Sequence, residues 1–197
     1  MKILLVITGL GVGGAERLVT ALADYYVSQG HDVMLVLFHG DTELCPVDSR
    51  VRVVNLNMKR NPFGVIGALS RLRRLIGEFQ PEVVNSHLVH ANILTRLLRL
   101  VTPMRCLISS AHNTNEEGRL RMLAYRLTDR LADISTNVSE EAVQAFQDQG
   151  ALFPGRMLAI HNGIDTEDFV FDQAARDRIR TELSVGDAIP LIIAVGR

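Results

Sequence analysis

Residues 1–16 read MKILLVITGLGVGGAE, and this stretch decides the expected fold. A short apolar run passes directly into a glycine-rich turn, in which Gly9, Gly11 and Gly14 satisfy the spacing GxGxxG. Glycines permit a tight turn and let the backbone approach a ligand, while the free N–H groups of a following helix favour an anion. The pattern predicts a strand, an anion-binding turn and a helix. The alternative is that the glycines serve only close packing of the helix on the strand.

The rest of the chain repeats this alternation of short Val- and Ile-rich runs with helical patterns. Nearly all-apolar strands are typical of a sheet covered on both faces, and β–α alternation with short connections indicates parallel strands. We therefore expect an α/β fold with a doubly wound, mostly parallel Rossmann-like sheet. The expected strands are 1–8, 32–38, 51–57, 82–87, 105–111, 133–138 and 157–162, and the expected helices are 14–29, 62–79, 90–101, 118–131 and 139–149.

The C-terminal segment has a different character. A polar helical stretch at 172–184 precedes LIIAV at 191–195, which has the composition of another buried parallel strand. Such a strand needs a helix to cover it. We expect a first domain at 1–170 and, at 171–197, an interdomain linker with the first strand of a truncated second domain. The alternative is that this strand completes the first sheet.

Composition excludes several classes of protein. The 197 residues are 47% hydrophobic and 22% charged, which excludes a disordered or low-complexity chain. Two cysteines without a CxxC spacing indicate neither a disulfide scaffold nor a zinc module. Apolar runs stay far below the roughly 18 residues that a transmembrane helix needs. We expect a cytoplasmic, reduced domain.

The formal charge of −1 conceals a segregation of charge. Residues 50–130 carry fourteen Arg and Lys against five Asp and Glu, so acidic residues dominate the two ends. A basic middle suggests an anionic partner such as phosphate, nucleic acid or a lipid headgroup. The alternative is that these arginines solvate outer helix faces. The candidate contacts with an anionic membrane are Lys59, Arg60, Arg71 and Arg74, in and just before an expected helix.

Five motifs occur in an order that resembles one enzyme family. GLGVGGAERLV follows the first expected strand, HLVHAN the fourth and SSAHNTN the fifth, and NVSEEAV and IHNGID come later. Together they resemble the N-terminal domain of family 4 retaining glycosyltransferases with the GT-B fold, including bacterial surface-polysaccharide enzymes. LIIAVGR resembles the first strand of that family's C-terminal domain.

The resemblance implies half of an enzyme. In the family two Rossmann-like domains face each other across the active site: the N-terminal domain holds the acceptor, and the C-terminal domain binds the nucleotide-sugar and carries an E-x7-E pair. Residues 1–197 alone are therefore expected to be inactive. The implied partners are a nucleotide-sugar donor and a saccharide or lipid-linked acceptor in polysaccharide, O-antigen or capsule synthesis. Peripheral attachment to the inner face of the cell membrane stays open, and neither a nucleic-acid partner nor a metal or other cofactor is expected.

Site residues follow from matching the motifs. His112 lies just past the carboxyl end of an expected strand, where open α/β sheets bind ligands, and it is the candidate catalytic residue. His87 is expected to face the cleft, and HxxH formed with His90 is only a weak metal signal without an HExxH pattern. The donor-loop candidates are Gly11, Gly13, Gly14 and Glu16, and the acceptor or sugar contacts are His87, Asn113, Thr114 and Asn162.

Two other functions compete with sugar transfer. A nicotinamide-dependent dehydrogenase or epimerase could use the same GxGxxG turn, but it needs an acidic residue closing the second strand. That strand ends Phe38-His39-Gly40, with Asp41 displaced into the loop. A nucleic-acid-binding module could use the arginine-rich middle, but three Tyr, no Trp and no recognisable nucleic-acid motif argue against it.

Overall fold

The computed structural model describes residues 1–40, 43–116, 118–164, 166 and 170–194. The chain divides into two compact units, Met1–Asn162 and Gly163–Arg197. The first unit contains a complete sheet with its helices, and the described part of the second contains the helix α6. The expected loop position of Asp41 lies outside the described residues.

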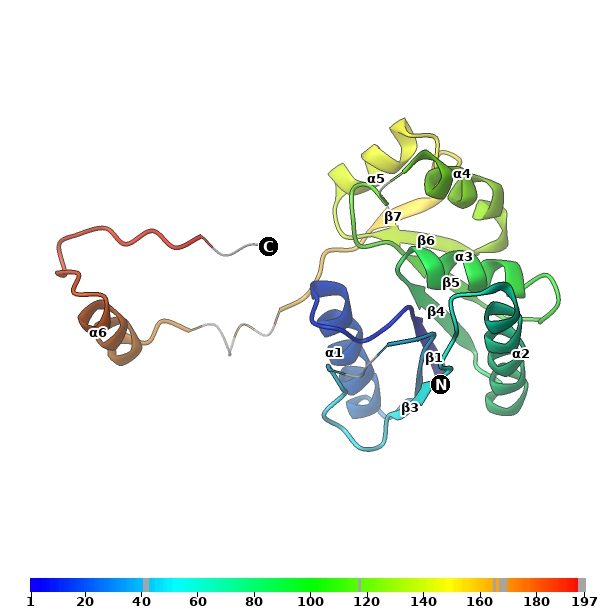
Figure 1. Ribbon diagram of the computed structural model, residues 1–197, viewed down its shortest axis with the longest axis horizontal. Coiled ribbons are helices and arrows are strands. Elements are labelled where there is room, and N and C mark those ends of the chain that lie inside the picture. Colours follow the sequence, from blue (N-terminus) through cyan, green and yellow to red (C-terminus); the bar gives the residue numbers. More distant parts are fainter. Residues whose placement is uncertain (41–42, 117, 165, 167–169, 195–197) are drawn as a thin grey trace. The chain divides into compact units, whose positions relative to one another are not determined.

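Seven parallel strands form one sheet in the order β3-β2-β1-β4-β5-β6-β7 (Figure 1). The expected doubly wound α/β sheet is thereby confirmed. From β1 the chain builds outward to β3, returns to place β4 on the other side of β1, and then builds outward again. Ligands in such sheets bind at the carboxyl ends of the strands beside this reversal. The strands are β1 Lys2–Ile7, β2 Asp32–Leu37, β3 Arg52–Asn55, β4 Val83–His87, β5 Leu107–Ser110, β6 Ile134–Asn137 and β7 Met157–Ala159.

Local sequence explains where several helices begin and end. The side chain of Asn61 accepts a hydrogen bond from the Gly64 N–H at 2.7 Å, and Ser139 accepts one from the Ala142 N–H at 3.2 Å. Gly30, with φ of 79°, supplies the left-handed residue after the first helix. The helices are α1 Gly14–Ser28, α2 Pro62–Phe79, α3 Val89–Leu98, α4 Arg119–Thr128, a 3-10 turn at Asp129–Leu131, α5 Glu140–Asp148 and α6 Gln173–Glu182.

Strand β1 lies at the centre of the core because both its faces are covered. Leu4 and Val6 belong to one apolar cluster together with residues of α2, whereas Leu5 and Ile7 belong to a second cluster with residues of α1. Alternate residues of a strand point to opposite faces, so one apolar run supplies both clusters. A third cluster joins α3, α4 and α5.

The described part of the segment expected to form a C-terminal strand, residues 191–194, is not paired with another strand. Residues 191–194 are not in a strand, and Ile192 and Ile193 are 91% and 70% exposed. A strand needs a neighbour for its N–H and C=O groups. No described strand pairs with this segment, and the expected first strand of a second domain stays a prediction.

Candidate functional site

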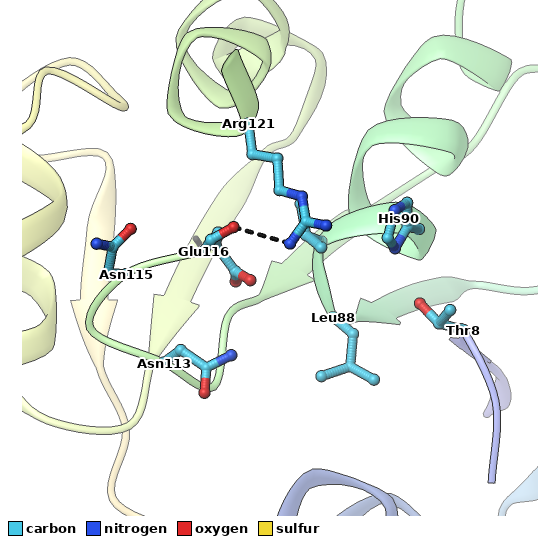
Figure 2. Close-up of a pocket in the computed structure, with 8 residues that line it drawn as sticks. Thr8, Leu88, His90, Asn113, Asn115, Glu116 and Arg121 are labelled. Atoms are coloured by element: carbon cyan, nitrogen blue, oxygen red, sulfur yellow. Dashed lines mark hydrogen bonds between the residues drawn. The ribbon is translucent and has the colours of Figure 1, made fainter. Parts of the chain in front are cut away.

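A polar cavity of about 270 Å³ opens at the carboxyl ends of the central strands (Figure 2). Three segments that are distant in sequence converge on it: the end of β1, the start of α3, and the loop that joins β5 to α4. This is the edge at which a parallel sheet binds ligands. The lining residues are Thr8, Leu88, Val89, His90, Asn113, Asn115, Glu116 and Arg121.

Arg121 of α4 joins that helix to the loop after β5 at the cavity wall. Its guanidinium donates to the backbone carbonyl of Glu116 at 3.0 Å (Figure 2). The Glu116 side chain is buried, and the hydroxyl of Tyr125 donates to its carboxylate at 3.5 Å. Burial, followed by the nearby Glu116 charge, raises the pKa of Tyr125, so this hydroxyl stays protonated and remains a donor.

The cavity has an electropositive side at His90. Burial is the main cause that lowers the pKa of His90, and electrostatic interactions with the neighbouring Arg121, His39 and Arg60 lower this pKa further. The ring is therefore neutral near pH 7 while the surrounding groups favour negative charge. A cavity lined by Arg121 together with Thr8, Asn113 and Asn115 suits a hydroxyl-rich ligand.

Two histidines at the carboxyl ends of adjacent strands form a hydrogen-bonded pair. His87 ends β4, His112 follows β5, and the two rings are joined by a hydrogen bond of 3.1 Å between Nδ1 of His87 and Nε2 of His112. Burial lowers the pKa of His87 to about 3, to which the charge of His112 contributes, and burial lowers the pKa of His112 to about 4. Both rings are neutral at pH 7, with one donating and the other accepting.

The burial of His87 corrects the expectation that it faces the cleft. Its side chain is 1% exposed, whereas His112 is only partly buried. His87 therefore contacts His112 rather than the outside of the domain. Nε2 of His87 and Nδ1 of His112 are buried without a hydrogen-bond partner among the described residues. Neither of these two nitrogens is accessible to solvent.

Leu88 carries backbone strain between this pair and the cavity. It has φ of 72° and ψ of 154°, a region that is essentially restricted to glycine, at a cost of about 1–3 kcal/mol. Its N–H donates to the carbonyl of Ser110 at 3.3 Å, and its own carbonyl accepts from the N–H of Asn92 at 2.9 Å. The fold therefore holds Leu88 in place against its preference, as happens at functional sites.

The glycine-rich turn leaves open space. A Cβ on Gly9 would lie 2.9 Å from the backbone oxygen of His39, so packing requires this glycine. A Cβ on Gly11 or Gly14 would meet nothing within 4 Å, so packing does not explain either residue. Gly13 is the N-cap of α1, and a Cβ there would meet the flexible carboxylate of Glu16 in the first turn.

The remaining candidate residues are distributed over the domain. Asn113 and Thr114 are exposed on the loop that holds His112, and Asn113 lines the cavity. Asn162 is exposed at the end of the first unit and does not line it. Within the described residues, no three His, Cys, Asp or Glu side chains are grouped as metal ligands require.

The basic residues expected to contact a membrane are exposed, but two of them already have partners. Arg71 donates to the carbonyl of Leu56 at 2.7 Å, and Arg74 pairs with Glu78 at 3.7 Å. Lys59 and Arg60 are exposed just before α2. In the described part of the chain, no helix combines the length and the apolar character needed to cross a bilayer.

Sequence reasoning missed Arg121, Glu116 and the strained Leu88. Arg121 was expected to belong to a helix without a specified role, and Glu116 follows the HNTN residues directly. The adjacency of Glu116 to that motif was the available signal. Leucine rarely adopts a positive φ, so the residue type of Leu88 does not predict this conformation. The backbone hydrogen bonds of Leu88 with Ser110 and Asn92 hold it there.

Residues 12–168 match the sequence model of Glycosyltransferase Family 4. The chain belongs to this family. The match begins at Val12, so it includes Gly13, Gly14, His87 and His112 and every residue that lines the cavity except Thr8. A comparison with curated proteins finds no match.

Solved structures share the fold at low sequence identity. HepE from Anabaena, crystallised with UDP, is 18% identical with a TM-score of 0.77, over 93% of this chain and 50% of that chain. A glycosyltransferase from Rickettsia africae is 14% identical with a TM-score of 0.78, over 95% and 51%. Sucrose-phosphate synthase from Thermosynechococcus elongatus is 13% identical with a TM-score of 0.75, over 96% and 54%. The chain therefore spans about half the length of these proteins.

Proposed function

We propose that this chain is the acceptor-side domain of a glycosyltransferase that moves a sugar from a nucleotide-sugar to a saccharide. The observation that carries the proposal is the convergence of the family's two loop motifs on one edge of the sheet. The glycine-rich turn follows Thr8, and the loop with His112 and Asn113 follows β5, so both begin at the same polar cavity. HepE was solved with UDP and also with UDP-glucose, which supports a nucleotide-sugar donor.

The residues around the cavity suit the departure of a diphosphate. In sugar transfer, the leaving diphosphate needs preorganised donors and positive charge. Backbone N–H groups at the start of α1 supply donors, and the open space at Gly11 and Gly14 lets a phosphate approach them. Arg121 adds positive charge at the wall of the cavity.

His112 is proposed to hold the transferred sugar in the reacting position. The hydrogen bond from His87 fixes the ring, and Nδ1 has no partner among the described residues. Because the imidazole is neutral at pH 7, that nitrogen exchanges a hydrogen bond with a sugar hydroxyl without bringing a charge. Asn113 and Thr114 on the same loop add neutral polar groups for the acceptor or the sugar.

The finer parts of the proposal rest on the resemblance of the motifs. They are transfer with retention of configuration, a lipid-linked acceptor in the synthesis of a surface polysaccharide, and work at the inner face of the membrane. The basic middle of the sequence supports an anionic acceptor carrier. The dehydrogenase alternative lacks the acidic residue at the end of β2, which is followed by Phe38 and His39.

A transfer assay tests this function. Protein containing this chain together with a donor-binding domain is incubated with labelled nucleotide-sugars and membrane or saccharide acceptors. We expect label in the acceptor, and none when residues 1–197 are supplied alone. In parallel, amide chemical shifts of the 197-residue chain are recorded with UDP and with NAD. Perturbation of Gly11 and Gly14 by NAD but not by UDP, or transfer by the chain alone, would contradict the proposal.

A further inference from the structure

Helix α4 has an apolar stripe on its solvent side. Leu120, Leu123 and Leu127 are 81%, 51% and 75% exposed, and their spacing of three and four residues places them on one face. The opposite face is formed by Met122 and Tyr125, which are buried in the cluster shared with α3 and α5. The helix is therefore apolar on two faces, and the domain covers only one of them.

A row of arginines runs beside this leucine stripe. Arg119 and Arg126 lie seven residues apart on α4, to one side of the leucines, and Arg130 follows in the 3-10 turn. The guanidinium groups of Arg126 and Arg130 lie 3.5 and 4.9 Å from the ring centre of Phe153, which holds both at the surface. Arg119–Thr128 contains no acidic residue. Exposed leucines next to a purely basic row are typical of a helix that lies in a membrane interface.

We propose that this face of α4 docks on an anionic lipid bilayer, with the leucines among the acyl chains and the arginines at the headgroups. Each basic residue near an anionic surface contributes about 1 kcal/mol. A second copy of the chain in an antiparallel two-fold contact fits the face less well, because that contact through the leucines would bring the two arginine rows together. An anionic bilayer offers acyl chains to the leucines and negatively charged headgroups to the arginines.

Docking through α4 also has a consequence for the site. The same helix supplies Arg121, which lines the cavity and is bonded to the loop after β5. The cavity would then lie close to the lipid surface, within reach of a saccharide on a lipid carrier. This step rests on the proposed function, whereas the docking itself does not. The proposed docking places the membrane contact on α4. The sequence had suggested α2, where Arg71 and Arg74 already have partners.

Vesicle sedimentation tests the docking on the 197-residue chain. Vesicles of phosphatidylcholine with phosphatidylglycerol are compared with vesicles of phosphatidylcholine alone, at low and high salt. We expect binding only to the anionic vesicles, weakened by salt. Changing Leu120, Leu123 and Leu127 together to Ser should lower the binding constant at least about tenfold. Because these side chains are exposed, circular dichroism should stay unchanged.

Two further variants keep the test decisive. On α2, Phe63 and Ile66 are 87% and 62% exposed, so changing both to Ser removes comparable apolar surface from another helix and should alter binding less than about twofold. Changing Arg119 and Arg130 to Gln should reduce the salt dependence. Equal binding to neutral vesicles, or loss through the α2 variant instead, overturns the proposal. A leucine-dependent dimer without vesicle binding overturns it in favour of a second copy. Vesicle binding is measured without any sugar, so failure of transfer and failure of docking are separate results.

Discussion

The two halves of the sheet are built by different physical means. In β1 and β2 the buried residues are aliphatic, and they pack into apolar clusters on both faces. The strands β4, β5 and β6 end instead in the sequences NSH, SS and STN, whose Ser, Thr, Asn and His side chains are almost all buried. The first half depends on shape and apolar contact, and the second depends on directional hydrogen bonds.

Arg96 and Asn92 of α3 organise the polar half. The Arg96 side chain, 1% exposed, donates to Ser109 at 3.0 Å and to Ser135 at 2.9 Å. Asn92 accepts from Ser86 at 2.7 Å and donates to the hydroxyl of Tyr125 at 2.8 Å. Directional bonds fix orientation more closely than apolar contacts do. The difference teaches that the polar half positions the groups at its carboxyl edge, while the apolar half is the scaffold.

The largest effect is expected from Arg96→Met. The change keeps most of the side-chain volume but removes the donors to the hydroxyls of two strands, so buried polar groups lose their partner. We expect the free energy of unfolding to fall by about 3–5 kcal/mol. Urea unfolding measures it, with the exposed Arg105→Met as the matched control. Stability equal to that of the unchanged chain would show that the network is not what holds the polar half.

Val36→Ala probes the apolar half. Val36 is fully buried in the cluster between the sheet and α2, so the change leaves a cavity and removes two methyl groups. The free energy of unfolding should fall by about 2 kcal/mol. The side chains at the carboxyl edge should keep their chemical shifts, because no directional bond is lost. Shifts in the histidine resonances on this change would break the distinction between the two halves.

The histidine pair predicts a dependence of stability on pH. The pKa values of His87 and His112, about 3 and about 4, lie below the ordinary value of 6.5. Between pH 6.5 and 4 the unfolded chain takes up protons that the folded chain does not, so stability is present above this window and is lost as the pH falls.

His87→Gln removes one of these two groups and tests that dependence. The fall in the free energy of unfolding should become shallower by about 1 kcal/mol per pH unit in the same window. Urea unfolding at a series of pH values measures both slopes, and His31→Gln, with a histidine outside the pair, is the control. Identical slopes in the unchanged chain and His87→Gln would show that the pair is not neutral in the folded state.

The smallest effect is expected from Arg74→Ala on α2. Both side chains of the Arg74–Glu78 pair are more than half exposed, and their nitrogen and oxygen lie 3.7 Å apart. Such pairs contribute below about 0.5 kcal/mol. Thermal unfolding should therefore be almost unchanged. A loss as large as that from Val36→Ala would mean that surface charge matters in the apolar half.

The sequence predicted the strands and helices better than the buried polar contacts between them. The apolar strands, the glycine turn and the caps at Asn61 and Ser139 act locally, so they could be read from neighbouring residues. The burial of Arg96 depends on hydroxyls from two later strands, and an arginine in an amphipathic helix is ordinarily exposed. The contact of His87 with His112 likewise exists only because β4 and β5 pair with His87 opposite Ser110.

The segment at 191–194 shows what local composition alone leaves undetermined. Its composition is that of a buried strand, but composition supplies no partner. Backbone groups form a strand only when a neighbour accepts and donates, and in this chain the described strands all belong to the first unit. Strand propensity therefore predicts a strand correctly only where the fold places a second strand beside the segment.

Turnover of His112→Ala tests the central claim most directly, namely that the polar half holds the group that positions the transferred sugar. The measurement is kcat for sugar transfer by protein containing this chain and a donor-binding domain, with His31→Ala as the control. We expect His112→Ala to lower kcat by about 100-fold or more while its unfolding transition remains close to that of the control. Turnover within about twofold of the unchanged protein would contradict the account.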